Sequence, residues 1–450
     1  MLRIKTLLRP SAFLILTLSG TFCFAQDKPA RTMFRLFWQD TKTNQLMWGD
    51  VKRADNNWSI EPQSVPGFPK LDSERQGLVQ MQAVGGTIVV GVRDEEGGKF
   101  QSGWVSIDAG VTVEDHGDHS HWYYKAPPKV IVSRLDDQQG NPAHVYVYDE
   151  QVILANDSKN GFTVLTADQI KSNDPRNSGT FYSGGGNHIT LAAHSKQVVY
   201  STWVDREGGN VGRIDVVNID SKRSNAGYSF KLPVGGLHGA TTAANRVFFA
   251  PSDGVYSLIA DVGLSNPPHD AAIEHISLGS DSKTGKPNRT GAFANLDSWV
   301  LFAYGSGEDS KIGMIDATKP KLNLVSLNLP SGQGLSLVTP IVFKANDGRK
   351  LAMVPHDRKQ SENQEKVTVI DLDPNKDSDL SDAKIVSSIE VGPSMVEGHS
   401  GHHDVSVSPN NRLACISNSG DGSVWIVSLS DFSVQAKLSV GGSPARVIAQ

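Results

Sequence analysis

Short apolar runs separated by polar turns dominate the chain from about residue 30 onward. The runs are about four to seven residues long, as in TIVVGVR (87–93), QVILA (151–155) and SVWIVSL (423–429), and Gly, Asn, Asp and Ser lie between them. Few stretches show the periodicity of an amphipathic helix. The pattern predicts short antiparallel strands joined by tight turns, and so many of them indicate an all-β sandwich, barrel or propeller.

The spacing of the runs favours a propeller. Repeats begin near Leu78, His144, His188, His238, Thr290, Val338 and His403. Most intervals are roughly 45–65 residues, which suits a four-stranded blade with its loops. SPARVIAQ (443–450) is typical of one more innermost strand, and the first strands (33–61) have no partner before them. We therefore predict a single β-propeller of eight four-stranded blades, with seven as the alternative. The C-terminal strand would join the N-terminal blade and close the ring.

The first 25 residues are predicted to be a secretory signal peptide. Arg3, Lys5 and Arg9 precede a short apolar segment (12–18), and a cleavage site follows at Ala25. The propeller domain would then be residues 26–450. Its one cysteine, Cys415, cannot form an internal disulfide, and an exported protein without disulfides indicates the bacterial periplasm.

Charge and hydropathy exclude two classes of partner. The chain has 43 Lys and Arg residues against 48 Asp and Glu residues. Removal of the signal peptide leaves a net charge of about −8. Without a basic patch, nucleic acid is not expected as a partner. The mature chain has no apolar run long enough for a membrane span, and we expect a monomer that does not insert into a membrane.

Four histidines occupy equivalent positions in the repeats, close to the start of the first strand. They are His144, His188, His238 and His403. Equivalent positions on the blades of a ring face a common axis, and neutral imidazoles that converge are good ligands for Zn²⁺. Near the last of these positions, His402 or His399 could replace His403 as the ligand.

A second candidate metal site lies in one short polar segment. His116, His119 and His121 alternate with acidic residues in EDHGDHSH (114–121). We expect this segment to be a flexible loop, with weaker affinity than the site formed by the repeats. Imidazole ligands also admit Cu²⁺ and Ni²⁺, whereas the sequence lacks the features of a Ca²⁺ or Cu(I) site.

The segment HHDVSVSPNNRLACIS (402–417), with the later VGGSP (440–444), is similar to a bacterial β-propeller repeat. Together with the signal peptide and HGDHSHWYY (116–124), it makes the mature chain resemble the AztD-type periplasmic zinc chaperones. The resemblance implies a non-enzymatic protein that captures zinc. It also implies transfer of that zinc to the solute-binding protein of an ABC-type zinc importer.

Two other functions remain open from the residues alone. One is a metal-dependent hydrolase or lactonase, in which the metal keeps a position for water. The His-Asp pairs at 269–270 and 356–357 could supply general bases for a hydrolase, although such pairs are more typical of surface turns. The other is an interaction propeller that binds no metal.

Overall fold

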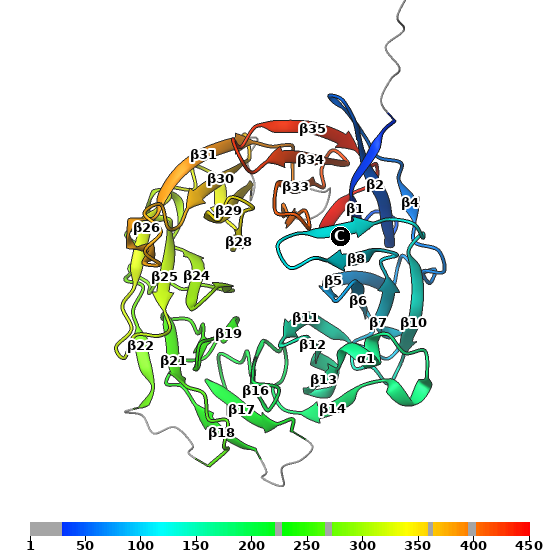
Figure 1. Cartoon of the computed structure of the whole chain (residues 1–450). Coiled ribbons are helices and arrows are strands. Elements are labelled where there is room, and N and C mark those ends of the chain that lie inside the picture. The colour runs from blue at the N-terminus through cyan, green and yellow to red at the C-terminus, as the bar shows by residue number, and fades with distance from the viewer. Residues whose placement is uncertain (1–28, 221–226, 266–271, 359–362, 395–401) are drawn as a thin grey trace, which may run out of the picture.

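The computed structural model describes residues 29–450 except 221–226, 266–271, 359–362 and 395–401. Eight antiparallel sheets follow one another around a ring (Figure 1). The predicted eight-bladed, all-β propeller is therefore confirmed. The predicted signal peptide, residues 1–25, lies outside the described residues. The described part of the chain contains no helix long and apolar enough to cross a membrane.

In each blade the strands follow one another from the centre of the ring outward. Blades one to four comprise β36 (Pro444–Ala449), β1 (Arg31–Asp40), β2 (Gln45–Ala54) and β3 (Asn57–Ser59), with β4 (Gln63–Ser64) beside β2; β5 (Gln76–Val84), β6 (Thr87–Asp94), β7 (Ser102–Asp108) and β10 (Lys129–Asp136); β11 (Pro142–Tyr148), β12 (Gln151–Asn156), β13 (Gly161–Leu165) and β14 (Thr180–Ser183); and β15 (Leu191–His194), β16 (Val198–Thr202), β17 (Arg213–Asn218) and β18 (Tyr228–Lys231).

Blades five to eight have the same arrangement. They comprise β19 (Ala240–Ala243), β20 (Arg246–Phe249), β21 (Val255–Ile259) and β22 (Glu274–Ile276); β23 (Ala294–Leu296), β24 (Trp299–Tyr304), β25 (Lys311–Asp316) and β26 (Val325–Asn328); β27 (Leu335–Leu337), β29 (Lys350–Arg358), β30 (Lys366–Asp371) and β31 (Lys384–Glu390), with β28 (Ile341–Lys344) beside β29; and β32 (Val405–Val407), β33 (Leu413–Asn418), β34 (Ser423–Ser428) and β35 (Val434–Ser439).

A few elements lie outside the blades. They are the hairpin of β8 (Thr112–Asp115) and β9 (Ser120–Tyr123), the one-turn helix α1 (Ala167–Ile170), and the 3₁₀ turns η1 (Asp157–Lys159), η2 (Pro175–Asn177), η4 (Gly307–Asp309) and η5 (Leu380–Asp382).

The C-terminal strand closes the ring as the sequence predicts. β36 is the innermost strand of the first blade and pairs with β1, with Leu36 opposite Ala449 and Trp38 opposite Val447. The backbone amides of Arg35 and Gln450 each donate to the other residue's carbonyl oxygen at 2.8 Å. Closure leaves no open edge between the first and last blades.

The hydrophobic core is divided among the blade interfaces. Eight clusters of buried side chains each join two neighbouring blades. In β1, Phe37 packs toward the second blade, whereas Leu36 and Trp38 pack toward the eighth. The middle strands are therefore buried on both faces, which explains their continuous apolar runs. The outer strand β31 (KIVSSIE) is largely exposed and carries polar residues among its apolar ones.

Candidate metal centre

Three of the four repeat histidines lie together at the inner strands of three consecutive blades. His144 lies in β11, and His188 and His238 lie just before β15 and β19. The ring centres are 4.9 Å apart for His144 and His188, and 5.1 Å apart for His188 and His238. The Nε2 atoms of His144 and His188 are 3.1 Å apart. We call His144, His188 and His238 the inner trio.

The spacing of the inner trio is close to that of a zinc site. Three imidazoles on tetrahedral Zn²⁺, with Zn–N bonds of about 2.0–2.1 Å, place their nitrogens about 3.3 Å apart and their ring centres about 5 Å apart. Two of the three pairs match these values. The third pair is wider, because the ring centres of His144 and His238 are 6.3 Å apart. Binding of one ion by all three rings would therefore require His144 or His238 to move.

Hydrogen bonds to the far side of two rings orient the inner trio. Nδ1 of His188 lies 3.1 Å from Oδ2 of Asp157. Nδ1 of His238 lies 3.1 Å from the carbonyl oxygen of Gly291. Both partners accept hydrogen bonds, so each Nδ1 carries the proton and each Nε2 keeps its lone pair for a ligand. Burial lowers the pKa of His144 to about 3, and the nearby His188 adds to this effect. His144 is therefore neutral at physiological pH, as metal ligation requires.

His116, His119 and His121 form a second, exposed cluster, which we call the hairpin trio. Their ring centres are 5.0–5.2 Å apart, and one ring nitrogen of each lies within 4.8 Å of the other two. Acidic side chains adjoin the rings, because Nδ1 of His119 lies 2.7 Å from Asp118 and Nε2 of His116 lies 3.6 Å from Glu114. The spacing fits three ligands of one Zn²⁺ at the surface.

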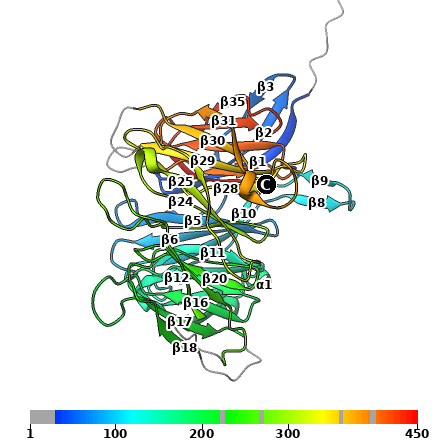
Figure 2. The same ribbon diagram turned by 90° about the vertical axis from the view of Figure 1, so that its left-hand side faces the viewer.

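The segment around the hairpin trio is a loop only in part: His116 and His119 lie between β8 and β9, whereas His121 lies in β9. The segment is a β-hairpin, with Glu114 opposite His121 in β8 and β9, and it projects beyond the ring of blades (Figure 2). The strands were not recognised because every residue of β8 is exposed, so the sequence lacks apolar alternation there. Arg35 holds both ends of the insertion, since its Nη1 donates to Ala109 O at 2.8 Å and to Ala126 O at 2.6 Å.

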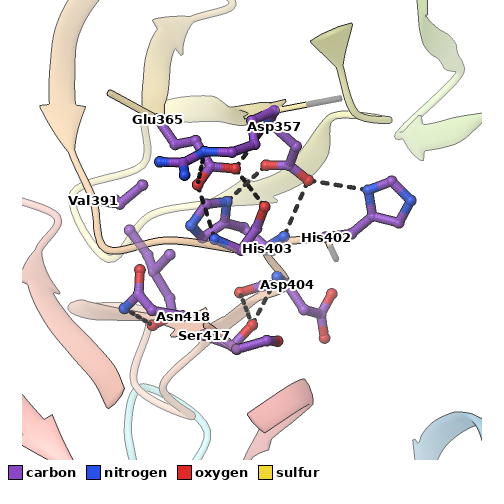
Figure 3. A network of polar contacts seen from close by, with 12 residues as sticks. Asp357, Glu365, Val391, His402, His403, Asp404, Ser417 and Asn418 are labelled. Atoms are coloured by element: carbon purple, nitrogen blue, oxygen red, sulfur yellow. Dashed lines mark hydrogen bonds and ion pairs between the residues drawn. The ribbon is translucent and has the colours of Figure 1, made fainter. Parts of the chain in front are cut away.

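His403 is not part of the inner trio, contrary to the sequence prediction of four converging histidines. Its ring is fully buried between the seventh and eighth blades (Figure 3). Nδ1 lies 2.6 Å from Oδ1 of Asp357, and Nε2 lies 2.9 Å from the carbonyl oxygen of Gly392. Both ring nitrogens thus face oxygen acceptors, and each carries a proton to donate. Although burial opposes the charge, the bond to Asp357 and the other acceptors raise the pKa of His403. The ring is an imidazolium in a buried ion pair, not a free ligand.

Asp357, Glu365 and His403 lie close enough to hold a metal, but hydrogen bonds satisfy them already. Glu365 accepts from the backbone amides of Arg358 and Ser394 at 2.8 and 2.9 Å, and also from the Ser394 hydroxyl. Oδ2 of Asp357 lies 3.1 Å from Nδ1 of His402, whose side chain is 58% exposed. We interpret this group as a structural network. His399, the remaining alternative ligand, lies outside the described residues.

The His-Asp pair at 356–357 is not a surface turn, as the sequence suggested, but lies at the end of β29. His356 is buried, with Nδ1 3.2 Å from the Ser331 carbonyl oxygen and Nε2 2.9 Å from the Thr368 hydroxyl. Burial lowers the pKa of His356 to about 4. This ring is not placed to act as a base on a substrate. The other pair, 269–270, lies outside the described residues.

Sequence reasoning missed the residues that hold these sites in place. Asp157 contacts His188, Arg35 holds the hairpin, and Asp357 pairs with His403. Each lies far along the chain from its partner, in a segment with no distinctive motif. The polar run NDSKN (156–160) around Asp157, for example, is typical of any turn.

No protein-family model and no curated protein matches the chain. Solved structures do match in fold. A structure of apo AztD from Citrobacter koseri has a TM-score of 0.59 and 15% identity, covering 93% of this chain and 97% of that one. A second C. koseri AztD structure gives a TM-score of 0.60 at the same identity and coverage. Dihydro-heme d1 dehydrogenase NirN in complex with DHE gives 0.53 at 13% identity, covering 93% of this chain and 75% of that one. These likenesses show the fold.

Proposed function

We propose that the protein is a periplasmic zinc chaperone that binds Zn²⁺ as cargo and passes it to the solute-binding protein of an ABC-type zinc importer. The observation that carries the proposal is the convergence of three imidazoles from three consecutive blades, with two Nε2 atoms 3.1 Å apart. A propeller needs no such cluster for its fold, because its core lies between the blades. The resemblance to AztD-type chaperones and the likeness in fold support the same function.

The chemistry of the two trios favours binding and release over catalysis. Three neutral imidazoles bind Zn²⁺ without a fixed fourth protein ligand, so a ligand from a receiving protein can enter the open position. The hairpin trio is exposed and projects from the ring, where another protein can reach it. We propose that both trios bind zinc, with the hairpin trio at the site of exchange. Export through a signal peptide, residues 1–25, belongs to the same proposal.

The open coordination position also keeps a hydrolase as the alternative, because a zinc-bound water there would become a nucleophile. A mechanism of that kind needs a base beside the water. His356 is the histidine that the sequence offered for that role, and its nitrogens are already engaged. We therefore propose that the chain is not an enzyme, and the experiment includes an assay that tests this.

Zinc titration of the mature protein against a chromophoric chelator tests the function. We expect two equivalents per chain. One should disappear in a variant with the inner trio changed to alanine, and the other in a variant with the hairpin trio changed to alanine. Zinc-loaded protein is then mixed with a periplasmic zinc solute-binding protein in the presence of excess chelator. We expect the zinc to reach the solute-binding protein and not the chelator. Turnover of zinc-loaded protein on an ester and lactone panel would favour the hydrolase. Absence of zinc binding would leave an interaction propeller.

A further inference from the structure

Asp157 is a partly buried carboxylate at the centre of contacts between three blades. It begins the turn η1 between β12 and β13 of the third blade, and its side chain is 9% exposed. Oδ2 lies 3.1 Å from Nδ1 of His188, which belongs to the fourth blade. Oδ1 accepts from the backbone amide of Ile189 at 3.0 Å. Arg93, from β6 of the second blade, reaches Oδ2 at 3.5 Å.

The contact with Asp157 decides which nitrogen of His188 is free. An ionised carboxylate only accepts hydrogen bonds, so Nδ1 of His188 donates and carries the proton. The lone pair then lies on Nε2, which faces Nε2 of His144 at 3.1 Å. Two lone pairs at that distance would repel each other, so Nε2 of His144 carries a proton in the zinc-free protein and donates to His188. Zinc binding must displace this proton.

We propose that Asp157 is a positioning residue for the inner zinc site, one that holds His188 in the Nδ1-protonated tautomer and aims its Nε2 at the metal. Arg93, 3.5 Å from Oδ2, places a balancing positive charge beside the carboxylate. When zinc binds, His144 loses the proton on Nε2 to solvent and takes up one on Nδ1. His188 changes no proton. Carboxylates that orient a ligating histidine in this way commonly raise metal affinity about 10- to 100-fold.

This inference rests on the proposed function, because it names the residue that organises the proposed zinc site. A purely structural role for Asp157 is the competing explanation, since Oδ1 also caps the amide of Ile189. The two roles differ in one observable. A structural role places no demand on the tautomer of His188, whereas the positioning role requires it before any metal is present.

The experiment uses the full mature chain with the hairpin trio changed to alanine, so that zinc titrates the inner trio alone. Asp157→Asn keeps the size of the side chain but replaces one acceptor oxygen with a donor. Asp157→Glu keeps the carboxylate and serves as the conservative variant. Asp205→Asn is the matched control, because Asp205 bonds to Asn187 beside His188 through a different carboxylate. Long-range ¹H–¹⁵N NMR of the imidazoles reports each tautomer, and competition titration reports zinc affinity.

In the wild-type background, we expect His188 to be protonated on Nδ1 before and after zinc, and His144 to change from Nε2 to Nδ1. Asp157→Asn should mix the His188 tautomers and weaken zinc binding about 10- to 100-fold. Asp157→Glu should restore the tautomer and part of the affinity, and Asp205→Asn should change neither. An unchanged His188 tautomer in Asp157→Asn overturns the inference, whether or not affinity falls. A wild-type inner trio that binds no zinc refutes the proposed function instead.

Discussion

Replacing His403 with alanine should destabilise the fold and leave zinc binding intact. The imidazolium of His403 and the carboxylate of Asp357 are 2.6 Å apart, with side chains 0% and 2% exposed. Removing one partner of a buried ion pair costs about 3–5 kcal/mol, because the other charge is left without compensation. Asp357 keeps the backbone amide of His403 and the ring of His402, each at 3.1 Å. We therefore expect the free energy of unfolding to fall by about 3 kcal/mol, the lower end of that range.

The pH dependence of this loss follows from the two pKa shifts. The pKa of His403 is raised, so its contribution to stability is complete below about pH 6.5 and is lost as pH rises through the folded-state pKa. Burial acts to raise the pKa of Asp357, but hydrogen bonding from His402 and His403 outweighs it, so the pKa is lowered. That contribution is present above about pH 4 and is lost as pH falls through the folded-state pKa. The pair should therefore stabilise the fold most between about pH 4 and pH 6.5.

Urea unfolding at pH 5.5 and pH 9, followed by tryptophan fluorescence, measures the effect. The unfolding midpoint of His403→Ala should lie below the wild-type value, with the larger gap at pH 5.5. His402→Ala is the control, because this exposed partner should contribute less than about 1 kcal/mol. Adding Asp357→Asn to His403→Ala should recover stability by removing the unpaired charge. An unchanged unfolding midpoint together with weaker zinc binding at the inner trio would refute the reasoning. It would indicate that His403 is a zinc ligand.

Four further predictions concern the zinc sites and the closure of the ring. His144→Ala, His188→Ala and His238→Ala should each lower the affinity of the inner site at least about tenfold in competition titrations, and unchanged affinity in all three would exclude that site. Changing the hairpin trio to alanine should remove one zinc equivalent and shift stability by no more than about 0.5 kcal/mol, measured by thermal melting. A larger loss would mean that the hairpin supports the blades. Zinc affinity should fall between about pH 7 and pH 5, because protons compete for imidazole. The inner site should lose less, since the pKa of His144 is about 3 and this ring stays neutral in that range. A flat pH profile at both sites would exclude histidine ligands. Truncation after Ser443 removes β36 and opens the edge of β1, so circular dichroism and size-exclusion chromatography should report unfolding or association. A folded, monomeric truncation product would show that closure is dispensable.

The fold could be predicted from the sequence because the geometry of a blade depends mainly on residues that lie close together in the chain. A middle strand such as β6 is buried on both faces and therefore reads as a continuous apolar run, and its turns carry Gly, Asn and Asp. The repeat spacing then gives the blade. The closing strand was predictable too, because the last residues form an inner strand with no outer strands after it.

The site was predictable only in part, because equivalent positions in the repeats do not guarantee equivalent surroundings. His188 and His238 precede their inner strands and face His144, whereas His403 precedes β32 in the same way and is buried. The difference comes from Asp357, which lies 46 residues away in another blade and captures the ring. No residue near His403 in the sequence indicates the contact with Asp357.

The sequence by itself determined most of the blade strands and their turns, the repeat that forms a blade, and the chemical type of the candidate ligands, since these depend on neighbouring residues and on period. Tertiary structure decided which histidines meet, which nitrogen of each ring is free, and which imidazole is charged. Those properties depend on partners such as Asp157, Gly291 and Asp357, which come from other turns or other blades. A proton on a ring nitrogen is placed by the group that faces it, and only the closed ring of blades brings that group into contact.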